Sequence, residues 1–242
     1  MKIGFVGLGE FGRAVQKIAH DRGHETAAEI SRGQKISAEN LKNCEIIFEA
    51  TNPQNVISNV EKFCELKKNF VIATTGWYEK MDEIKKKVER AKVAAMWSGN
   101  FSVGVNLFFE IVKKAAQLFD AAPEFDIWAH EIHHKKKVDS PSGTAKILEK
   151  ILLENLSRKK KIVEEKLDRK IADDEIHFSS TRGGFANFSH TICFDSAADF
   201  VKIEHAARNR DGYSLGAVRA MEWLNLQKPG FYKMEDFLKN IL

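Results

Sequence analysis

Short apolar runs alternate with amphipathic patterns through the N-terminal part of the chain. The apolar runs, each short enough for a buried strand, cover residues 2–6, 24–30, 45–48, 70–73 and 93–96. Helical patterns cover 12–22, 53–66 and 79–91, and Pro53 stands where its helix would begin. Regular alternation of strand and helix predicts a doubly wound parallel sheet, a Rossmann-like α/β fold.

The pattern changes after Asn100. From Val103 to Phe119 apolar side chains recur at helical spacing, which predicts one long amphipathic helix. Strands are then expected at 125–132, 188–194 and 200–205, and helices at 142–156, 213–226 and 233–242. The polar, charge-rich stretch between 156 and 188 is assigned no element. These elements predict a second, α+β domain of residues 103–212, while 1–102 and 213–242 form the first domain.

Composition narrows the class of protein. Hydrophobic residues make up 43% of the chain and charged residues 30%, as in ordinary globular proteins. No apolar run approaches the roughly 20 residues that span a bilayer, and a strand begins at Lys2, so we expect neither a membrane segment nor a signal peptide. The three cysteines lack CxxC spacing, which favours free thiols in a reducing cytoplasm. A net charge of +4 with interleaved acidic residues argues against a nucleic-acid partner.

A glycine-rich turn joins the first predicted strand to the first helix. Its sequence has the spacing of the dinucleotide-binding fingerprint and reads Gly7-Leu8-Gly9-Glu10-Phe11-Gly12. In that motif the first glycine permits a tight turn, the second lets the pyrophosphate approach, and the third allows close helix packing. An ordinary glycine-rich turn fits the pattern alone, but a strand before it and a helix after it favour a nucleotide site.

The end of the second strand bears on which cofactor binds. An acidic residue at this tip binds the ribose 2′-OH of NAD, whereas arginine accommodates the 2′-phosphate of NADP. With Ser31 at the tip, Ser31 and Arg32 form a phosphate pocket and NADPH is favoured. With Glu29 at the tip, NADH remains possible. The spacing alone equally fits Arg32 as an ordinary loop arginine.

Two further loops follow parallel strands at the sheet edge where ligands bind in such folds. Threonines and glycines there can line the nicotinamide and its ribose, and an asparagine can bind an amide group. Ordinary turn formation is the alternative role for the same residue types. The cofactor-binding residues expected in these loops are Ala73, Thr74, Thr75, Ser98, Gly99, Asn100 and Phe101.

The most distinctive segment lies between the strand at 125–132 and the helix that follows. It reads His133-His134-Lys135-Lys136-Lys137-Val138-Asp139-Ser140-Pro141-Ser142-Gly143-Thr144. Two imidazoles beside three ammonium groups are electrostatically costly unless an anion neutralises them. The Ser-Gly-Thr end adds hydroxyls and backbone N–H groups at a helix N-terminus, where carboxylates and phosphates bind readily. The segment therefore predicts a site for a small acid.

Two residues of this segment can act as proton donors. His133 and Lys137 stand four positions apart, and either could deliver a proton near neutral pH. A solvated basic loop is the alternative for the lysines, and a metal site is the alternative for the paired histidines. Only Glu131 stands nearby as a further ligand, so we expect no metal.

The chain resembles the dihydrodipicolinate reductase family. The most specific part of the resemblance is the long motif from Glu131 to Thr144, and the resemblance as a whole extends over nearly the entire chain. It includes the glycine turn, 73–76, 98–106 and the Gly216-Ala217 pair.

What this resemblance implies is a reductase of a cyclic unsaturated dicarboxylate in diaminopimelate and lysine biosynthesis, using NADPH and/or NADH. His133 would protonate the ring carbon beside the one that receives the hydride, and Lys137 would be a second proton donor or charge stabiliser. The two substrate carboxylates would be bound by His134, Ser142, Gly143 and Thr144. The second domain would bind substrate and form a homo-oligomer, a tetramer in the family.

Two other functions fit a chain of this general kind. A different two-domain dehydrogenase, for example one that acts on aspartate, would have no need of three lysines ahead of Ser-Gly-Thr. A nucleotide-sensing protein without catalysis shares the fold. It would have no use for both proton donors.

Overall fold

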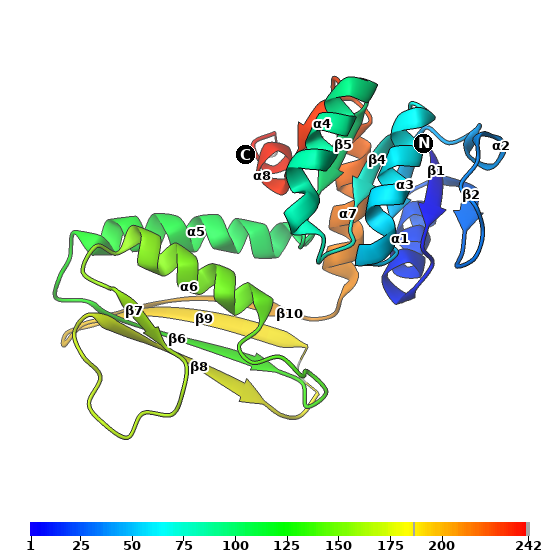
Figure 1. Ribbon diagram of the computed structural model, residues 1–242. Coiled ribbons are helices and arrows are strands. Elements are labelled where there is room, and N and C mark those ends of the chain that lie inside the picture. The colour runs from blue at the N-terminus through cyan, green and yellow to red at the C-terminus, as the bar shows by residue number, and fades with distance from the viewer. Residues whose placement is uncertain (186, 241–242) are drawn as a thin grey trace. The chain divides into compact units, whose positions relative to one another are not determined.

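The computed structural model describes residues 1–185 and 187–240, and the chain divides into two compact units. The first unit comprises Met1–Val103 and Asp211–Leu242, and the second comprises Gly104–Arg210. Each unit is built around one sheet, as Figure 1 shows.

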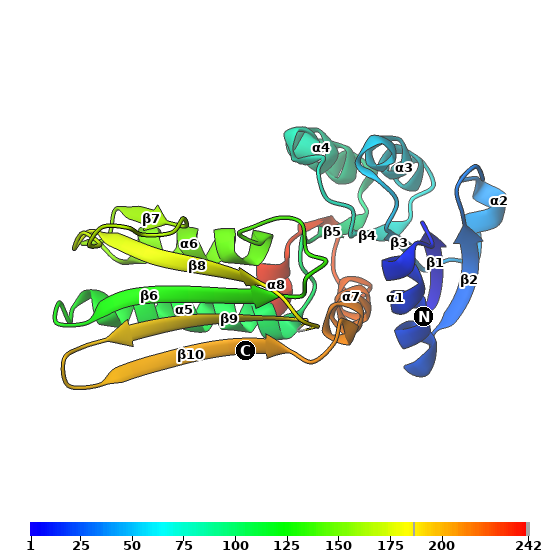
Figure 2. The same ribbon diagram turned by 90° about the horizontal axis from the view of Figure 1, so that it is seen from below.

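The first unit contains a six-stranded sheet in the order β11-β5-β4-β3-β1-β2, and every pairing is parallel. Its strands are β1 (Lys2–Val6), β2 (Glu25–Ile30), β3 (Ile46–Glu49), β4 (Asn69–Ile72), β5 (Ala94–Trp97) and β11 (Gly230–Tyr232). Its helices are α1 (Glu10–Asp21), α2 (Ala38–Leu41), α3 (Pro53–Glu65), α4 (Met81–Ala91), α7 (Asp211–Leu224) and α8 (Met234–Leu238). Figure 2 shows α3 and α4 on one face of the sheet and α1 and α7 on the other. The predicted doubly wound fold is confirmed.

The second unit is a mixed sheet with helices on one face. Its strand order is β10-β9-β6-β8-β7, in which β6 pairs parallel with β8 and antiparallel with β9. The strands are β6 (Asp126–His133), β7 (Lys161–Val163), β8 (Glu175–Arg182), β9 (Phe188–Asp195) and β10 (Phe200–Ala207). Helices α5 (Val103–Asp120) and α6 (Gly143–Asn155) lie over this sheet (Figure 1). The buried core between them is formed by apolar residues of both layers, among them Phe108, Leu148 and Phe178.

Several elements were not predicted, and β8 matters most because it lies beside β6. Only Ile176 and Phe178 are apolar in this strand, and its remaining positions are polar or charged, half of them serine or threonine. Strands β7 and β11 are three residues long and helix α2 is four, too short for a periodic pattern. The helix predicted at 79–91 begins instead with a 3₁₀ turn, Tyr78–Lys80. The one predicted at 233–242 ends at Leu238, and residues 241–242 lie outside the described part of the chain.

Cys44, Cys64 and Cys193 are buried and free, as predicted. Burial raises the pKa of all three thiols, that of Cys64 to about 11, so they stay protonated and unreactive. Among the described residues, no helix has the length and apolar character needed to cross a membrane.

Replacement of Gly216 should destabilise the first unit. A Cβ at this position of α7 would lie 1.7 Å from the carbonyl oxygen of Phe101, within one of the predicted cofactor loops. We expect Gly216→Ala to lower the free energy of unfolding by about 1–3 kcal/mol or more, because backbone must move to admit the methyl group. Urea unfolding followed by circular dichroism measures this. Gly212→Ala on the same helix is the control, since its Cβ would meet only the Ser102 hydroxyl at 3.6 Å. Equal midpoints for the two variants would contradict the close approach.

Candidate active site

The glycine turn has the geometry that its three glycines predict. Gly7 has a φ of +92°, and a Cβ there would lie 2.4 Å from the Ala50 carbonyl oxygen. A Cβ on Gly12 would lie 2.2 Å from the Gly7 carbonyl oxygen, so this glycine allows α1 to approach the turn. Gly9 is exposed, has no atom within 4 Å of a notional Cβ, and caps α1 without a side chain. A phosphate group therefore has access to the N-terminus of α1.

The tip of β2 is occupied by Ser31. The strand ends at Ile30, whose carbonyl oxygen accepts a hydrogen bond from Gly7 N at 3.0 Å. Glu29 lies within the strand, and its Oε1 accepts a 2.6 Å hydrogen bond from Gln16 Nε2. Ser31 and Arg32 follow the strand directly and are exposed. Of the two alternatives for this tip, the structure therefore has the serine there.

The loop after β4 is fixed by two indole groups. The Thr74 carbonyl oxygen accepts hydrogen bonds from Trp77 Nε1 at 2.7 Å and from Trp97 Nε1 at 3.2 Å. The two indole rings pack edge to face, with centroids 5.8 Å apart. Ala73 N donates to the Glu49 carbonyl oxygen at 2.8 Å, and Thr75 is exposed. The loop therefore has a defined backbone, with Thr75 open to a ligand.

The loop after β5 is held by its own side chains. Ser98 Oγ donates to the Asn100 carbonyl oxygen at 2.7 Å, and Asn100 Oδ1 accepts from Ser102 N at 2.9 Å. Phe101 is buried, whereas Gly99 is exposed. The amide of Asn100, expected to bind cofactor, thus also shapes the loop.

Strand β6 delivers Glu131 and His133 to one face, where both are buried. Glu131 Oε1 accepts three hydrogen bonds, from Ser142 N at 3.1 Å, Ser180 Oγ at 2.8 Å and Arg182 Nη2 at 2.7 Å. Its other oxygen, Oε2, lies 2.7 Å from His133 Nδ1. One carboxylate therefore joins β6, β8 and the start of α6.

Charges and burial set the protonation of this cluster. Burial alone would raise the pKa of Glu131, but hydrogen bonds from Arg182, Ser180 and Ser142 outweigh it and lower the pKa below the usual value. Burial lowers the pKa of His133, with Glu131 opposing this change and Arg182 adding to it. Glu131 is therefore a carboxylate at neutral pH.

His190 supports the cluster from β9. Burial lowers its pKa to about 4, so the ring is neutral near pH 7. Its Nε2 lies 3.0 Å from Ser142 Oγ, and Ser142 Oγ also accepts from Ala145 N at 3.1 Å, which caps α6. The Ser142 side chain is therefore buried between a helix cap and a histidine. Gly143 is exposed, and Thr144 is half-buried at the N-terminus of α6.

Lys137 lies in the turn that follows β6. Its backbone N–H donates to the His134 carbonyl oxygen at 3.0 Å, and its Nζ lies 2.5 Å from Asp139 Oδ1. The hydrogen bond from Lys137 lowers the pKa of Asp139. Arg182 Nη2 donates to the Asp139 carbonyl oxygen at 2.7 Å, which ties this turn to β8.

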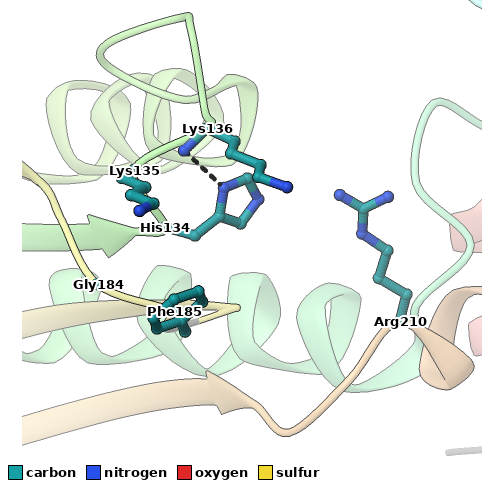
Figure 3. Close-up of a pocket in the computed structure, with 6 residues that line it drawn as sticks. All are labelled: His134, Lys135, Lys136, Gly184, Phe185 and Arg210. Carbon is teal, nitrogen blue, oxygen red and sulfur yellow. Dashed lines mark hydrogen bonds between the residues drawn. The ribbon is translucent and has the colours of Figure 1, made fainter.

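A pocket in the second unit is lined by cationic side chains. Its lining residues are His134, Lys135, Lys136, Gly184, Phe185 and Arg210. In Figure 3 the charged ends of Lys136 and Arg210 extend toward the space beside the His134 ring. Lys135 Nζ lies 5.3 Å from the centroid of the Phe185 ring. This concentration of positive charge suits a small anion.

The buried groups of Glu131, His133 and His190 also resemble a set of metal ligands, since their ligand atoms lie within 4.8 Å of one another. However, Glu131 Oε2 and His133 Nδ1 are 2.7 Å apart. Two ligands of one tetrahedral zinc would be about 3.3 Å apart, given bond lengths of about 2.0 Å. The adjacent Arg182 guanidinium would also repel a cation. The spacing therefore favours direct carboxylate–imidazole contact.

Sequence reasoning missed four residues that surround His133. Ser180 and Arg182 lie on β8, a strand that was not predicted. His190 falls in the apolar phase of the predicted strand 188–194, and this was the one signal available for it. Glu131 was considered as a metal ligand and as the first residue of the family motif, but no contact with His133 was predicted for it.

A parallel nucleotide-binding sheet and a second mixed sheet with a basic anion site define the class of two-domain pyridine-nucleotide-dependent oxidoreductases. Residues 1–101 match the family model for the N-terminus of dihydrodipicolinate reductase, and 104–238 match that for its C-terminus. The chain belongs to the dihydrodipicolinate reductase family.

Individual relatives agree with this assignment. The chain is 32% identical over 244 residues to the 4-hydroxy-tetrahydrodipicolinate reductase of Christiangramia forsetii, covering 100% of this chain and 99% of that one. It is 34% identical to that of Buchnera aphidicola subsp. Schizaphis graminum, covering 81% and 72%. The dipicolinate-bound dihydrodipicolinate reductase from Paenisporosarcina sp. TG-14 has the same fold, with a TM-score of 0.79, 20% identity and full coverage of both chains.

Proposed function

We propose that the chain catalyses the NAD(P)H-dependent reduction of 4-hydroxy-tetrahydrodipicolinate, or its dehydrated form, to tetrahydrodipicolinate in lysine and diaminopimelate biosynthesis. The observation that carries this proposal is the basic segment after β6, where buried His133 stands beside lysines and an exposed helix N-terminus. The relative from Christiangramia forsetii, which matches the whole chain, carries this activity in its name. A nucleotide sensor without catalysis would not require this arrangement.

The substrate site follows from the charges of the second unit. One carboxylate of the substrate binds the N–H groups of Gly143 and Thr144 at the start of α6, where the helix dipole favours an anion. The other binds Lys137 and His134. Ser142 contributes to the carboxylate site indirectly, by capping α6. Its hydroxyl is buried against His190 and Ala145 N.

His133 and Lys137 have distinct roles in this scheme. Reduction of the conjugated ring places a hydride on one carbon and requires a proton on its neighbour. His133 donates that proton, and Lys137 stabilises developing negative charge or supplies a second proton. Asp139 holds Lys137 Nζ before substrate arrives.

The residues of the first unit fit a dinucleotide, since Gly7 and Gly12 permit close backbone packing in the turn and Gly9 leaves open space at the start of α1. We assign the pyrophosphate to the whole turn Gly7-Leu8-Gly9-Glu10-Phe11-Gly12. The nicotinamide half is assigned to Ala73, Thr74, Thr75, Ser98, Gly99, Asn100 and Phe101. When bound, the cofactor supplies the hydride. Ser31 and Arg32 bind the 2′-phosphate, so NADPH is the preferred form.

A coupled assay tests the proposed function directly. A synthase generates the unstable substrate. The oxidation of NADPH and of NADH is followed in separate reactions by the loss of absorbance of the reduced nicotinamide. Turnover that depends on the synthase supports the proposal. Absence of turnover with both cofactors would refute it.

Replacement of Arg32 should affect one cofactor and spare the other. We expect Arg32→Ala to raise KM for NADPH about 10-fold or more, because a charge-assisted contact to the 2′-phosphate is lost, and to leave KM for NADH unchanged. Lys17→Ala removes an exposed charge from α1 and is the control. An equal effect of Arg32→Ala on both cofactors would remove Arg32 from the phosphate site.

We also propose a cytoplasmic homo-oligomer, a tetramer, whose contacts involve the sheet of the second unit. Support comes from Trp128 and Phe200, which are large apolar residues exposed on the face of this sheet that α5 and α6 leave open. The only other partner in this proposal is the small dicarboxylate. Neither nucleic acid nor membrane is part of it.

A further inference from the structure

We infer that Glu131 is a positioning residue for His133, holding the imidazole by its Nδ1 edge so that Nε2 is presented to the substrate. This inference rests on the proposed function, in which His133 is the acid. Glu131 is completely buried, and nothing in its position allows it to reach the substrate itself. It acts through the histidine.

The orientation of the Glu131 carboxylate is fixed by hydrogen bonds other than its contact with the imidazole. Its Oε1 accepts hydrogen bonds from Ser142 N at the start of α6 and from Ser180 Oγ and Arg182 Nη2 on β8. These donors prevent rotation of the carboxylate and leave Oε2 at 2.7 Å from His133 Nδ1. Because Glu131 and His133 are two positions apart on β6, they share one face of the strand.

The ring of His133 is restrained on its other sides as well. It stacks on Phe188 with centroids 5.6 Å apart and an interplanar angle of 20°, and it meets His190 edge to face at 5.4 Å. With Nδ1 held by a carboxylate and the ring plane held by Phe188, one orientation of Nε2 remains. This restraint is what a proton donor needs in order to reach one ring carbon.

The charged and titratable groups around His133 make Glu131 important for its protonation. Those that face it or its neighbours are Glu131 on β6, Lys137 and Asp139 in the following turn, Arg182 on β8, His190 on β9 and, beyond His190, His205 on β10. Burial lowers the pKa of His133, and the cations Arg182 and Lys137 lower it further. Glu131 and the more exposed Asp139 oppose them. Of the groups that oppose the decrease, Glu131 has the largest effect on the pKa of His133.

The variant Glu131→Gln distinguishes a role of Glu131 in positioning His133 from a role in stabilising the fold alone. Glutamine keeps the size and can still accept from the three Oε1 donors, but it removes the negative charge next to Nδ1. We expect the pKa of His133 to fall further, because a neutral amide replaces the charge that opposes its decrease. The pH above which kcat declines should move down with it, and kcat near pH 7.5 should fall about 10- to 100-fold, because a lower pKa leaves less of the acid form at that pH. KM for the dicarboxylate should change little.

Imidazole NMR gives a readout that does not depend on activity. Histidines labelled with ¹⁵N are titrated in the wild type and in Glu131→Gln, and the His133 signal is assigned by its loss in His133→Gln. Glu131→Asp retains the charge and should restore the titration toward the wild type, with a smaller loss of kcat. It also serves as the test variant if Glu131→Gln does not fold, because its shorter side chain should still lower kcat without raising KM. Glu149→Gln removes another buried carboxylate of the same unit, one paired with Lys146, and should leave the His133 titration unchanged.

The outcomes distinguish this inference from the function on which it rests. If His133→Gln retains full turnover, the acid in the proposed function is wrong, whatever Glu131 does to the titration. If His133→Gln loses turnover but Glu131→Gln leaves titration, pH profile and kcat as in the wild type, only the inference about Glu131 is overturned. Where Glu131→Asp stands in its place, an unchanged kcat overturns it. The inference is supported when Glu131→Gln shifts the titration and adds no further loss to His133→Gln in the double variant.

Discussion

His133→Gln should lower kcat by about 10²- to 10⁴-fold, the range typical of a lost general acid, and leave the Kd for NADPH within about twofold of the wild type. Glutamine is close to histidine in size and can still pack against Phe188, but it has no proton to give at neutral pH. The loss should therefore lie in the chemical step, and kcat and kcat/KM should fall together. Steady-state kinetics in the coupled assay and fluorescence titration with NADPH measure the two quantities.

A structural defect would produce a different pattern. His177→Gln on β8 is the control, since this histidine lies in the same sheet near the opposite end of β8 from Arg182. It should keep wild-type kcat. If His133→Gln kept full turnover, another group would have to deliver the proton, and His133 would be a packing residue only.

Lys137→Ala should weaken both binding and rate, with kcat/KM lowered by about 10²- to 10³-fold. A lysine facing a dianion contributes through a charge-assisted hydrogen bond, for which about 1.5–3 kcal/mol is typical, and its charge also stabilises the transition state. In the structure Lys137 Nζ is already held by Asp139, so it is placed before the substrate binds. Binding of pyridine-2,6-dicarboxylate, measured by calorimetry, isolates the binding contribution from the rate.

The control for Lys137 is a lysine of another basic run. Lys160→Ala removes an exposed charge from the same unit, where only its backbone N–H makes a hydrogen bond to Asp174 among the described contacts. It should leave kcat/KM unchanged. Normal affinity of Lys137→Ala for the diacid would remove Lys137 from the site.

How much of this could be predicted from the sequence depends on how local each signal is. The glycine turn was predictable because the whole motif, Gly7 to Gly12, lies within six consecutive residues between a strand and a helix. The alternating strands and helices of the first unit were predictable for the same reason. The exact tip of β2 was not, since strand ends vary by a few residues and two alternatives differed by only two positions.

The surroundings of His133 were not predictable, because they depend on contacts between distant segments. Arg182 reaches Glu131 only because β8 pairs with β6, and β8 has too few apolar residues to be recognised as a strand. The role of the Ser142 hydroxyl also depends on contacts that the sequence does not show. Its position in the motif predicted a ligand hydroxyl, whereas the fold uses that hydroxyl to cap α6 and to contact His190.

In the proposed reaction a doubly negative ring binds the cationic turn after β6, next to His133. A crystal structure of the protein with pyridine-2,6-dicarboxylate tests it most directly. We expect one carboxylate on the N–H groups of Gly143 and Thr144, the other near Lys137, and a ring carbon facing His133 Nε2. Density for the diacid elsewhere, with this turn facing only solvent, would contradict it.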